Sequence, residues 1–219
     1  MAPRGPFDFG RPRDGAPSVP AARPAGAEQR FEQALAEGRV GAAAALAMEL
    51  ARRGQRGIGP STARLQRVLA ADGLESGTRI EVLRGLAVLH SRGGRYGDAF
   101  ESMADSLILA QETGRTDLVC EAELHGAFLA VQVGALEHAH TLLDNAEWRA
   151  AELADDTRLG LIRIVRGVAC LAEGDAERAV ELIADGIRRS EDAGAREQAF
   201  ALRQLARALV RAERRESAP

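Results

Sequence analysis

Lysine is absent from this chain of 219 residues, so all 29 of its basic residues are arginine. The absence excludes Schiff-base chemistry, a serine and lysine dyad, and the lysine of a phosphate-binding loop. Aromatic residues make up only 4% of the sequence, so alanine and leucine must fill any core, which favours closely packed helices over a β-sandwich. The two cysteines, Cys120 and Cys170, fall inside predicted helices and suggest no disulfide framework. We therefore expect a reducing, cytoplasmic location.

Strong net charge and apolar runs are also lacking. The formal net charge is −3, so we expect no general attraction to nucleic acid or to an anionic membrane. The N-terminus has no apolar run, which predicts neither a signal peptide nor a membrane anchor. Six of the eight prolines lie between Pro3 and Pro24, and this composition predicts a disordered tail over residues 1–25. Heavy use of Ala, Arg and Gly suggests a high-GC bacterial gene.

One sequence pattern is repeated three times between Thr78 and Gly194. The turn glycines Gly94, Gly134 and Gly174 are spaced by 40 residues. Four further columns keep the same step and their size class: Ala87, Ala127 and Gly167; Ala99, Ala139 and Ala179; Met103, Leu143 and Ile183; Ser106, Ala146 and Gly186. A fixed period of this length is typical of stacked supersecondary units. The sequence therefore predicts an all-α fold, an α-solenoid of antiparallel helical hairpins.

The predicted hairpins occupy residues 77–194. Thr78 and Glu81 have the spacing of a capping box, and Asp155 and Asp175 are predicted N-caps. Residues 26–76 are predicted to form further helices, with or without a degenerate first copy, and residues 195–216 a C-terminal capping helix. We expect the small columns to let the two helices of a hairpin approach closely. The larger column is expected to fill the gap between successive hairpins, where Trp148 is also expected to pack.

At these columns the chain resembles the tetratricopeptide-repeat family. Six residues of the first copy fall where that family has W, L, G, Y, A and F: Leu83, Leu86, Ala87, His90, Ala99 and Met103. The tryptophan and tyrosine positions are not aromatic here, no proline closes a second helix, and the repeat exceeds the usual length of about 34 residues. The resemblance implies a long variant of that superhelix and leaves its function open.

The resemblance also implies a concave groove that holds a peptide or partner helix and is lined by the first helix of each hairpin. Transferred to this sequence, the groove residues are Arg84, Val88 and Arg92, then Glu121, His125, Phe128 and Gln132, then Leu161, Ile164, Val168 and Leu171. The groove is basic at one end, mixed in the middle and apolar at the other. The apolar end is covered by a partner, by the terminal helix or a second copy as a homodimer, or it is plain surface.

The terminal helix carries arginines at i, i+4 spacing, with leucines on another face: Arg203, Arg207, Arg211 and Arg215, and Leu202, Leu205 and Leu209. One interpretation is a capping helix with a solvated outer face. The alternative is a lead into an output domain, because the repeats resemble regulatory repeats found ahead of bacterial cyclic-dinucleotide synthase or transcription-factor domains.

No catalytic residue set and no metal or cofactor site can be assembled. His138 and His140 point about 200° apart on a helix and are predicted surface residues. Cys120 and Cys170 are predicted to be small buried side chains rather than nucleophiles. Two functions therefore stay open. The chain is either a non-catalytic module that binds a protein segment in its groove, or a regulatory domain in which a peptide or small molecule is sensed.

Overall fold

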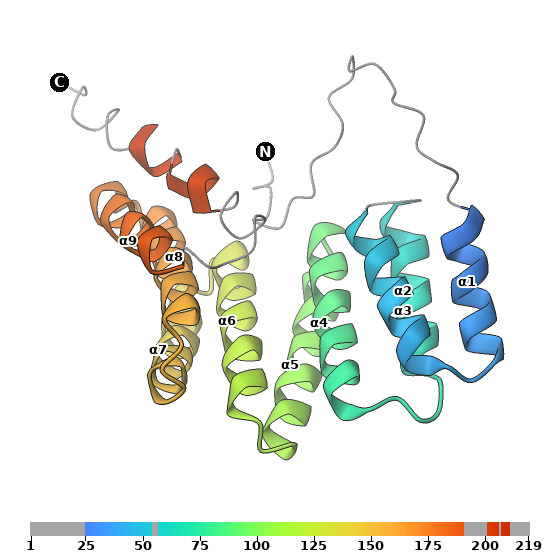
Figure 1. Cartoon of the computed structure of the whole chain (residues 1–219). Helices are drawn as coiled ribbons and strands as arrows, with labels where there is room; N and C mark the ends of the chain where they lie inside the picture. The colour runs from blue at the N-terminus through green and yellow to red at the C-terminus, as the bar shows by residue number, and fades with distance from the viewer. Residues whose placement is uncertain (1–24, 54–56, 191–200, 206, 211–219) are drawn as a thin grey trace, which may run out of the picture. The chain divides into compact units, whose positions relative to one another are not determined.

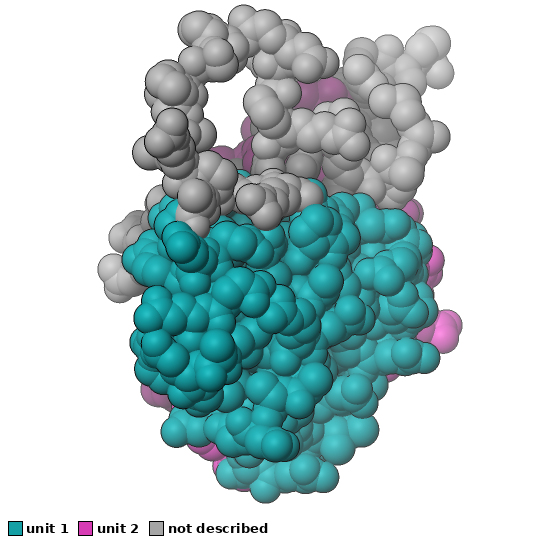
Figure 2. All heavy atoms as spheres, turned by 90° about the vertical axis from the view of Figure 1, so that its right-hand side faces the viewer, with its two compact units in different colours: residues 1–113 teal, residues 114–219 magenta. Residues whose placement is uncertain are grey.

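The computed structural model describes residues 25–53, 57–190, 201–205 and 207–210. These ranges contain the nine helices α1 to α9 and no strand (Figure 1). The chain divides into two compact units, residues 1–113 and 114–219, which are coloured separately in Figure 2. Residues 1–24 of the predicted tail lie outside the described residues, as do residues 195–200, 206 and 211–216 of the predicted terminal helix, whereas Ala25 already begins α1.

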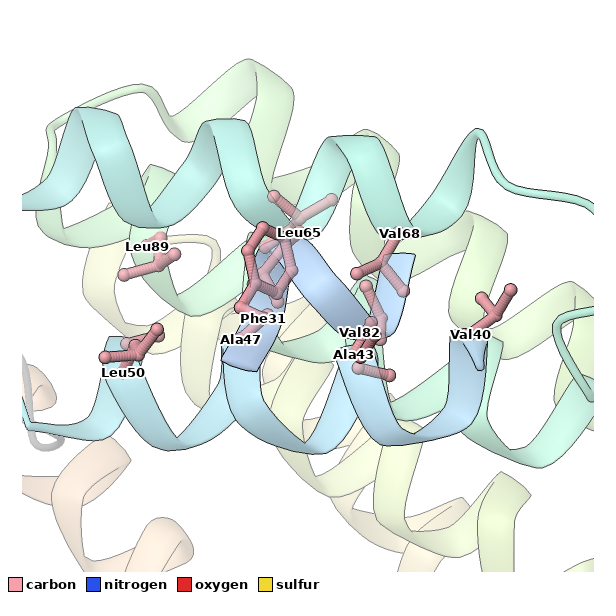
Figure 3. Close-up of a cluster of buried hydrophobic side chains, with 13 residues drawn as sticks. Phe31, Val40, Ala43, Ala47, Leu50, Leu65, Val68, Val82 and Leu89 are labelled. Atoms are coloured by element: carbon pink, nitrogen blue, oxygen red, sulfur yellow. The ribbon is translucent and has the colours of Figure 1, made fainter. Parts of the chain in front are cut away.

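The first unit contains five helices and the first complete repeat. Their bounds are α1 (Ala25–Ala36), α2 (Val40–Arg52), α3 (Ile58–Leu69), α4 (Ser76–Arg92) and α5 (Tyr96–Glu112). One hydrophobic core joins the first four of them, with Phe31, Leu50, Leu65 and Val82 buried at its centre (Figure 3). Because α4 contributes Val82, Leu86 and Leu89 to this core, the first repeat shares its interior with the N-terminal helices. The boundary between the units therefore falls after α5, inside the run of repeats.

Helices α2 and α3 form the hairpin that the sequence left undecided. Ala47 is fully buried, as its place 40 residues before Ala87 requires. The second helix is offset by two residues, since Gly59 is exposed and the buried positions Ser61, Leu65 and Val68 lie 38 residues before Ala99, Met103 and Ser106. This register is consistent with a degenerate first copy, which stays a prediction, and the two-residue offset explains why the alanine column does not extend through Gly59.

The second unit contains the other two complete hairpins. Its helices are α6 (Thr116–Val133), α7 (Leu136–Glu152), α8 (Asp156–Glu173) and α9 (Ala176–Arg189), followed by helical residues 201–205 and 207–210. Gly134 and Gly174 end α6 and α8 in the left-handed conformation, with φ of 81° and 90°. The side chains of Asp155 and Asp175 accept hydrogen bonds from the first-turn amides of α8 and α9. These turns and both N-caps were predicted from the sequence.

The four repeat columns other than the turn glycines are all buried, as the repeat predicted. At the third hairpin, a Cβ atom placed on Gly167 would lie 2.6 Å from Ile183 Cγ1 and 3.1 Å from the Ala179 carbonyl oxygen. The small column therefore allows the close approach of α8 and α9. Ile183, from the large column, therefore packs on Gly167 of its own hairpin, a contact that the repeat did not predict, and its role between successive hairpins stays a prediction.

A second crossing point recurs in each hairpin between residues 26 positions apart. Ser106 Oγ donates to the Ile80 carbonyl oxygen at 3.5 Å, and Cys120 Sγ donates to that of Ala146 at 3.3 Å. In the third hairpin both positions are glycine, and a Cβ atom on Gly186 would lie only 2.5 Å from the Gly160 carbonyl oxygen. The two helices therefore meet backbone to backbone at this point.

The predicted N-cap of α4 was wrong. Helix α4 begins at Ser76, its N-cap is Glu75, and no side chain caps it. A capping box would need a non-helical Thr78, but residues 76 and 77 are already helical, so Thr78 lies in the first turn. Helix α9 ends at Arg189, and Gly194, where the third copy was predicted to end, lies outside the described residues.

Candidate functional site

The predicted groove residues lie on the first helices of the hairpins, which belong to both units. Arg84, Val88 and Arg92 lie on α4 in the first unit, and all three are half-buried. The remaining groove residues lie on α6 and α8 in the second unit. The structure therefore brings the α6 and α8 residues together within one unit, and this pair of helices is the best-defined part of the site.

The α6 and α8 residues divide into an accessible set and a supporting set. Glu121, His125, Gln132, Leu161 and Val168 are half-buried, so a partner can reach them. The other three are interior side chains, since Phe128, Ile164 and Leu171 are 5%, 1% and 5% exposed. The groove assignment is corrected at these three positions, because a buried side chain shapes the surface from beneath without contacting a partner. The role of the accessible set stays a prediction.

One residue that the sequence did not single out joins the two helices. Arg158, in the first turn of α8, donates from Nη2 to Glu121 Oε1 of α6 at 2.8 Å. Its Nη1 also pairs with Asp155 Oδ2, and its backbone amide donates to Asp155 Oδ1 at 2.8 Å. Burial lowers the pKa of Arg158, but the hydrogen bond and charge of Glu121 outweigh this effect, so the pKa is raised. Arg158 lies one turn before the predicted groove residue Leu161, and this spacing could have identified it from the sequence.

The Arg158 cluster sets the charge at one end of the α6 and α8 face. The Arg158 guanidinium lies between the carboxylates of Glu121 and Asp155, so these three side chains together carry a formal charge of about −1. His125, one turn further along α6, donates from Nδ1 to the Glu121 carbonyl oxygen at 2.7 Å. This bond holds the ring in one orientation and, when the imidazole is neutral, places its proton on Nδ1. The end near Glu121 therefore favours positively charged or hydrogen-bond-donating groups.

Leu161 and Val168 form the apolar part of the same face. They lie seven residues apart on α8, so they occupy one side of the helix, two turns apart. Val168 packs against the small core of Ala130, Ala139 and Ala169, which anchors its backbone while part of its side chain remains accessible. Such anchored apolar side chains lose little conformational freedom when they contact a partner.

The two cysteines are unsuited to nucleophilic chemistry. Cys120 is fully buried on α6, and burial raises the pKa of its thiol to about 11. Burial likewise raises the pKa of Cys170. A thiol that is protonated near neutral pH is a poor nucleophile. Both cysteines therefore serve as small core side chains, as the sequence predicted.

Trp148 does not occupy the predicted position between hairpins. Its side chain is 58% exposed on α7, and the Arg149 guanidinium lies over its ring at 5.4 Å from the centroid. Arg149 also pairs with the buried carboxylate of Glu123 at 2.9 Å. The interior positions of α7 are instead filled by Ala139, Leu143, Ala146 and Ala150. Trp148 faces outward because it lies two residues from both Ala146 and Ala150, about 200° around the helix from these buried positions.

The histidines and acidic residues do not gather into a metal site. His138 is exposed, and His140 Nε2 lies 2.6 Å from Glu173 Oε1. Across the described ranges, no three side chains of the His, Cys, Asp or Glu types are placed to hold a metal ion. Among the same residues, every helix is too short or too polar to cross a membrane.

Comparison with known proteins extends the description of the fold. No protein-family model matches the sequence, and no curated protein matches it. Among solved structures, the chain is similar to the crystal structure of BtubC (BKLC) from P. vanneervenii, with a TM-score of 0.69 and 19% sequence identity. The similarity covers 86% of this chain and 82% of that chain. The chain is an all-α helical solenoid. At this level of identity the similarity shows the fold alone.

Proposed function

We propose that this chain is a non-catalytic, tetratricopeptide-like protein that holds a segment of a partner protein against the first helices of its hairpins. The resemblance in the repeat columns supports this family, since those columns are buried where two helices of a hairpin meet. The fold similarity to another helical protein is consistent with it. The proposal includes no catalytic step, no cofactor and no nucleic-acid partner.

One observation carries the proposal. On the α6 and α8 face, the accessible side chain of Leu161 lies one turn from the acidic cluster of Glu121, Arg158 and Asp155, and that of Val168 lies two turns further along α8. Apolar anchors with a few fixed polar groups are typical of peptide-binding surfaces. We therefore expect a partner segment with one or two apolar side chains and a basic group that reaches Glu121.

A peptide selection followed by matched alanine substitutions tests the proposal. Binders would first be selected from a random peptide library against the whole chain, and their affinities measured by isothermal titration calorimetry. Val168→Ala and Glu121→Ala should each weaken the selected peptides by about tenfold, which corresponds to the loss of a significant contact. Val133→Ala is the matched control, because Val133 is 39% exposed at the end of α6, outside the predicted groove.

Two outcomes would contradict the groove assignment. The first is that Val168→Ala and Glu121→Ala bind the selected peptides within about twofold of the wild type. The second is that Val133→Ala weakens them as much as Val168→Ala does. Melting temperatures measured with the same peptides and with small metabolites test the alternative, a ligand-sensing domain linked to a signalling output. Such a domain should show a melting temperature that rises with the concentration of a small metabolite as well as of a peptide.

A further inference from the structure

Helix α5 carries a continuous acidic stripe on its outer face. The stripe consists of Glu101, Asp105, Ile108 and Glu112, all of which are exposed, and the side chain of Ile108 is 53% exposed. These positions follow the spacing i, i+4, i+7 and i+11, so they lie along one side of the helix. Helix α5 has no basic residue. We call these four residues the α5 stripe.

The α5 stripe has no partner within the described part of the chain. None of its three carboxylates forms an ion pair or a side-chain hydrogen bond there. Glu101 and Asp105 are like charges at i, i+4, which weakens an isolated helix. An exposed isoleucine at the centre of such a stripe adds apolar surface where a solvated helix needs none. The stripe therefore has the composition of a contact surface for a basic, partly apolar helix.

The C-terminal helical residues of the same chain have the opposite composition. Residues 201–205 and 207–210 bury Ala201, Gln204 and Ala208 on one side. On the other side Arg203, Arg207 and Val210 are exposed, and the side chain of Val210 is 47% exposed. We call these three exposed residues the terminal stripe. Its flank carries the exposed side chain of Leu202.

The two stripes match in spacing as well as in charge. Both contain two like charges four residues apart, followed three residues later by an exposed aliphatic side chain. With a rise of about 1.5 Å per residue, a parallel alignment places Glu101 opposite Arg203 and Asp105 opposite Arg207, about 6 Å apart along both helices. In the same alignment Ile108 faces Val210. We propose that the α5 stripe docks the terminal stripe of a second copy of this chain.

The proposed contact has predictable properties. Each copy offers one stripe of each kind, so the interface is heterologous, and association either closes into a ring or continues as a chain of copies. Exposed ion pairs contribute little individually and are screened by salt. A contact between two single helices is smaller than a standard protein interface. We therefore expect weak, reversible and salt-sensitive self-association. It uses helices other than α6 and α8, so it stands independently of the proposed function.

Charge reversal on each side separately gives the sharpest test. The first variant carries Glu101→Arg and Asp105→Arg, and the second carries Arg203→Glu and Arg207→Glu. Sedimentation velocity in low salt should show self-association of the wild type and at least tenfold weaker self-association of each variant alone. Mixed together, the two variants should associate again, because every stripe then finds an opposite one on the other chain.

A charge change on another helix serves as the control. Glu137→Arg with Thr141→Arg reverses and adds charge at the same i, i+4 spacing on the exposed face of α7, and it should leave association unchanged. Circular dichroism would confirm that every variant keeps its helix content. The proposal is wrong if the wild type stays monomeric at about 200 μM in 50 mM salt, or if the mixed variants remain separate. It is also wrong if the two stripes pair within one chain. In that case the protein would be monomeric, and hydrogen exchange would show a protection of α5 that depends on salt.

Discussion

Replacing Gly167 with alanine would test how the third hairpin is packed. The added Cβ atom would lie 2.6 Å from Ile183 Cγ1 and 3.1 Å from the Ala179 carbonyl oxygen, whereas relaxed carbon contacts are about 3.5 to 4.0 Å. Ile183 cannot easily rotate away, because a β-branched side chain in a helix has one strongly preferred rotamer. Helices α8 and α9 must therefore move apart.

The expected magnitude combines two opposing effects. Overpacking of a tight core costs about 1 to 3 kcal/mol. Alanine is also favoured over glycine inside a helix by about 1 kcal/mol. The net loss should be about 1 kcal/mol, or a decrease in the melting temperature of the second unit by about 4 °C.

The first two hairpins indicate how the loss can be reversed. At the position of Gly167 they have alanine, and at the position of Ile183 they have Met103 and Leu143. Both Ala127 and Leu143 are fully buried in the second hairpin, so an alanine and a leucine fit together in this register. Leucine is unbranched at Cβ and has a second rotamer open to it in a helix. Ile183→Leu should therefore recover most of the stability that Gly167→Ala loses.

A double-mutant cycle with urea unfolding measures this coupling. The double variant should be more stable than the sum of the two single effects by about 1 kcal/mol, as expected for residues in contact. Effects that add to within about 0.5 kcal/mol would refute the idea that alanine at this position requires an unbranched partner across the hairpin.

Two further predictions follow from the described contacts. Gly186→Ala should destabilise the protein by about 3 kcal/mol, which is more than Gly167→Ala does. The added Cβ atom would lie 2.5 Å from the Gly160 backbone oxygen, and no rotamer change can relieve a contact with the backbone. As a control, Gly97→Ala places a Cβ atom with no other atom within 4 Å, so it should be neutral or slightly stabilising in the same urea titration. Burial holds the Cys120 thiol protonated up to a pKa of about 11, above its ordinary value of 9.0, so the stability it contributes is fully present below pH 9 and is lost as the pH rises towards 11. Urea titrations between pH 8 and 11 should show a smaller alkaline loss in Cys120→Ala than in the wild type, and equal losses would rule out this thiol as the cause.

Much of the fold could be predicted because the repeat encodes it locally. The left-handed turns at Gly134 and Gly174 and the N-caps at Asp155 and Asp175 all depend on a few neighbouring residues. Such features follow from backbone sterics and from the unpaired amides at a helix start. The N-cap of α4 was misplaced because a Thr and a Glu three residues apart can also both lie within a helix, as Thr78 and Glu81 do in α4.

The candidate site was predicted less completely, because it depends on which side of each helix faces a neighbour. Phe128 and Ile164 were assigned to a binding surface but are buried, and Trp148 was assigned to the interior but is exposed. Arg158 was missed because its partner Glu121 lies 37 residues earlier in the chain. A rotation of a helix by one residue moves a side chain by about 100°, and the sequence pattern alone does not fix that angle.

The sequence by itself determined that this protein is a stack of helical hairpins with a 40-residue period, since glycine and alanine recur wherever two helices must approach. Only the tertiary structure decided that the first repeat shares a core with the N-terminal helices and that Ile183 packs within its own hairpin. It also decided that Arg158 joins α6 to α8. The physical reason is that helix formation and turns depend on nearby residues, whereas packing depends on the relative rotation and separation of helices that are distant in the sequence.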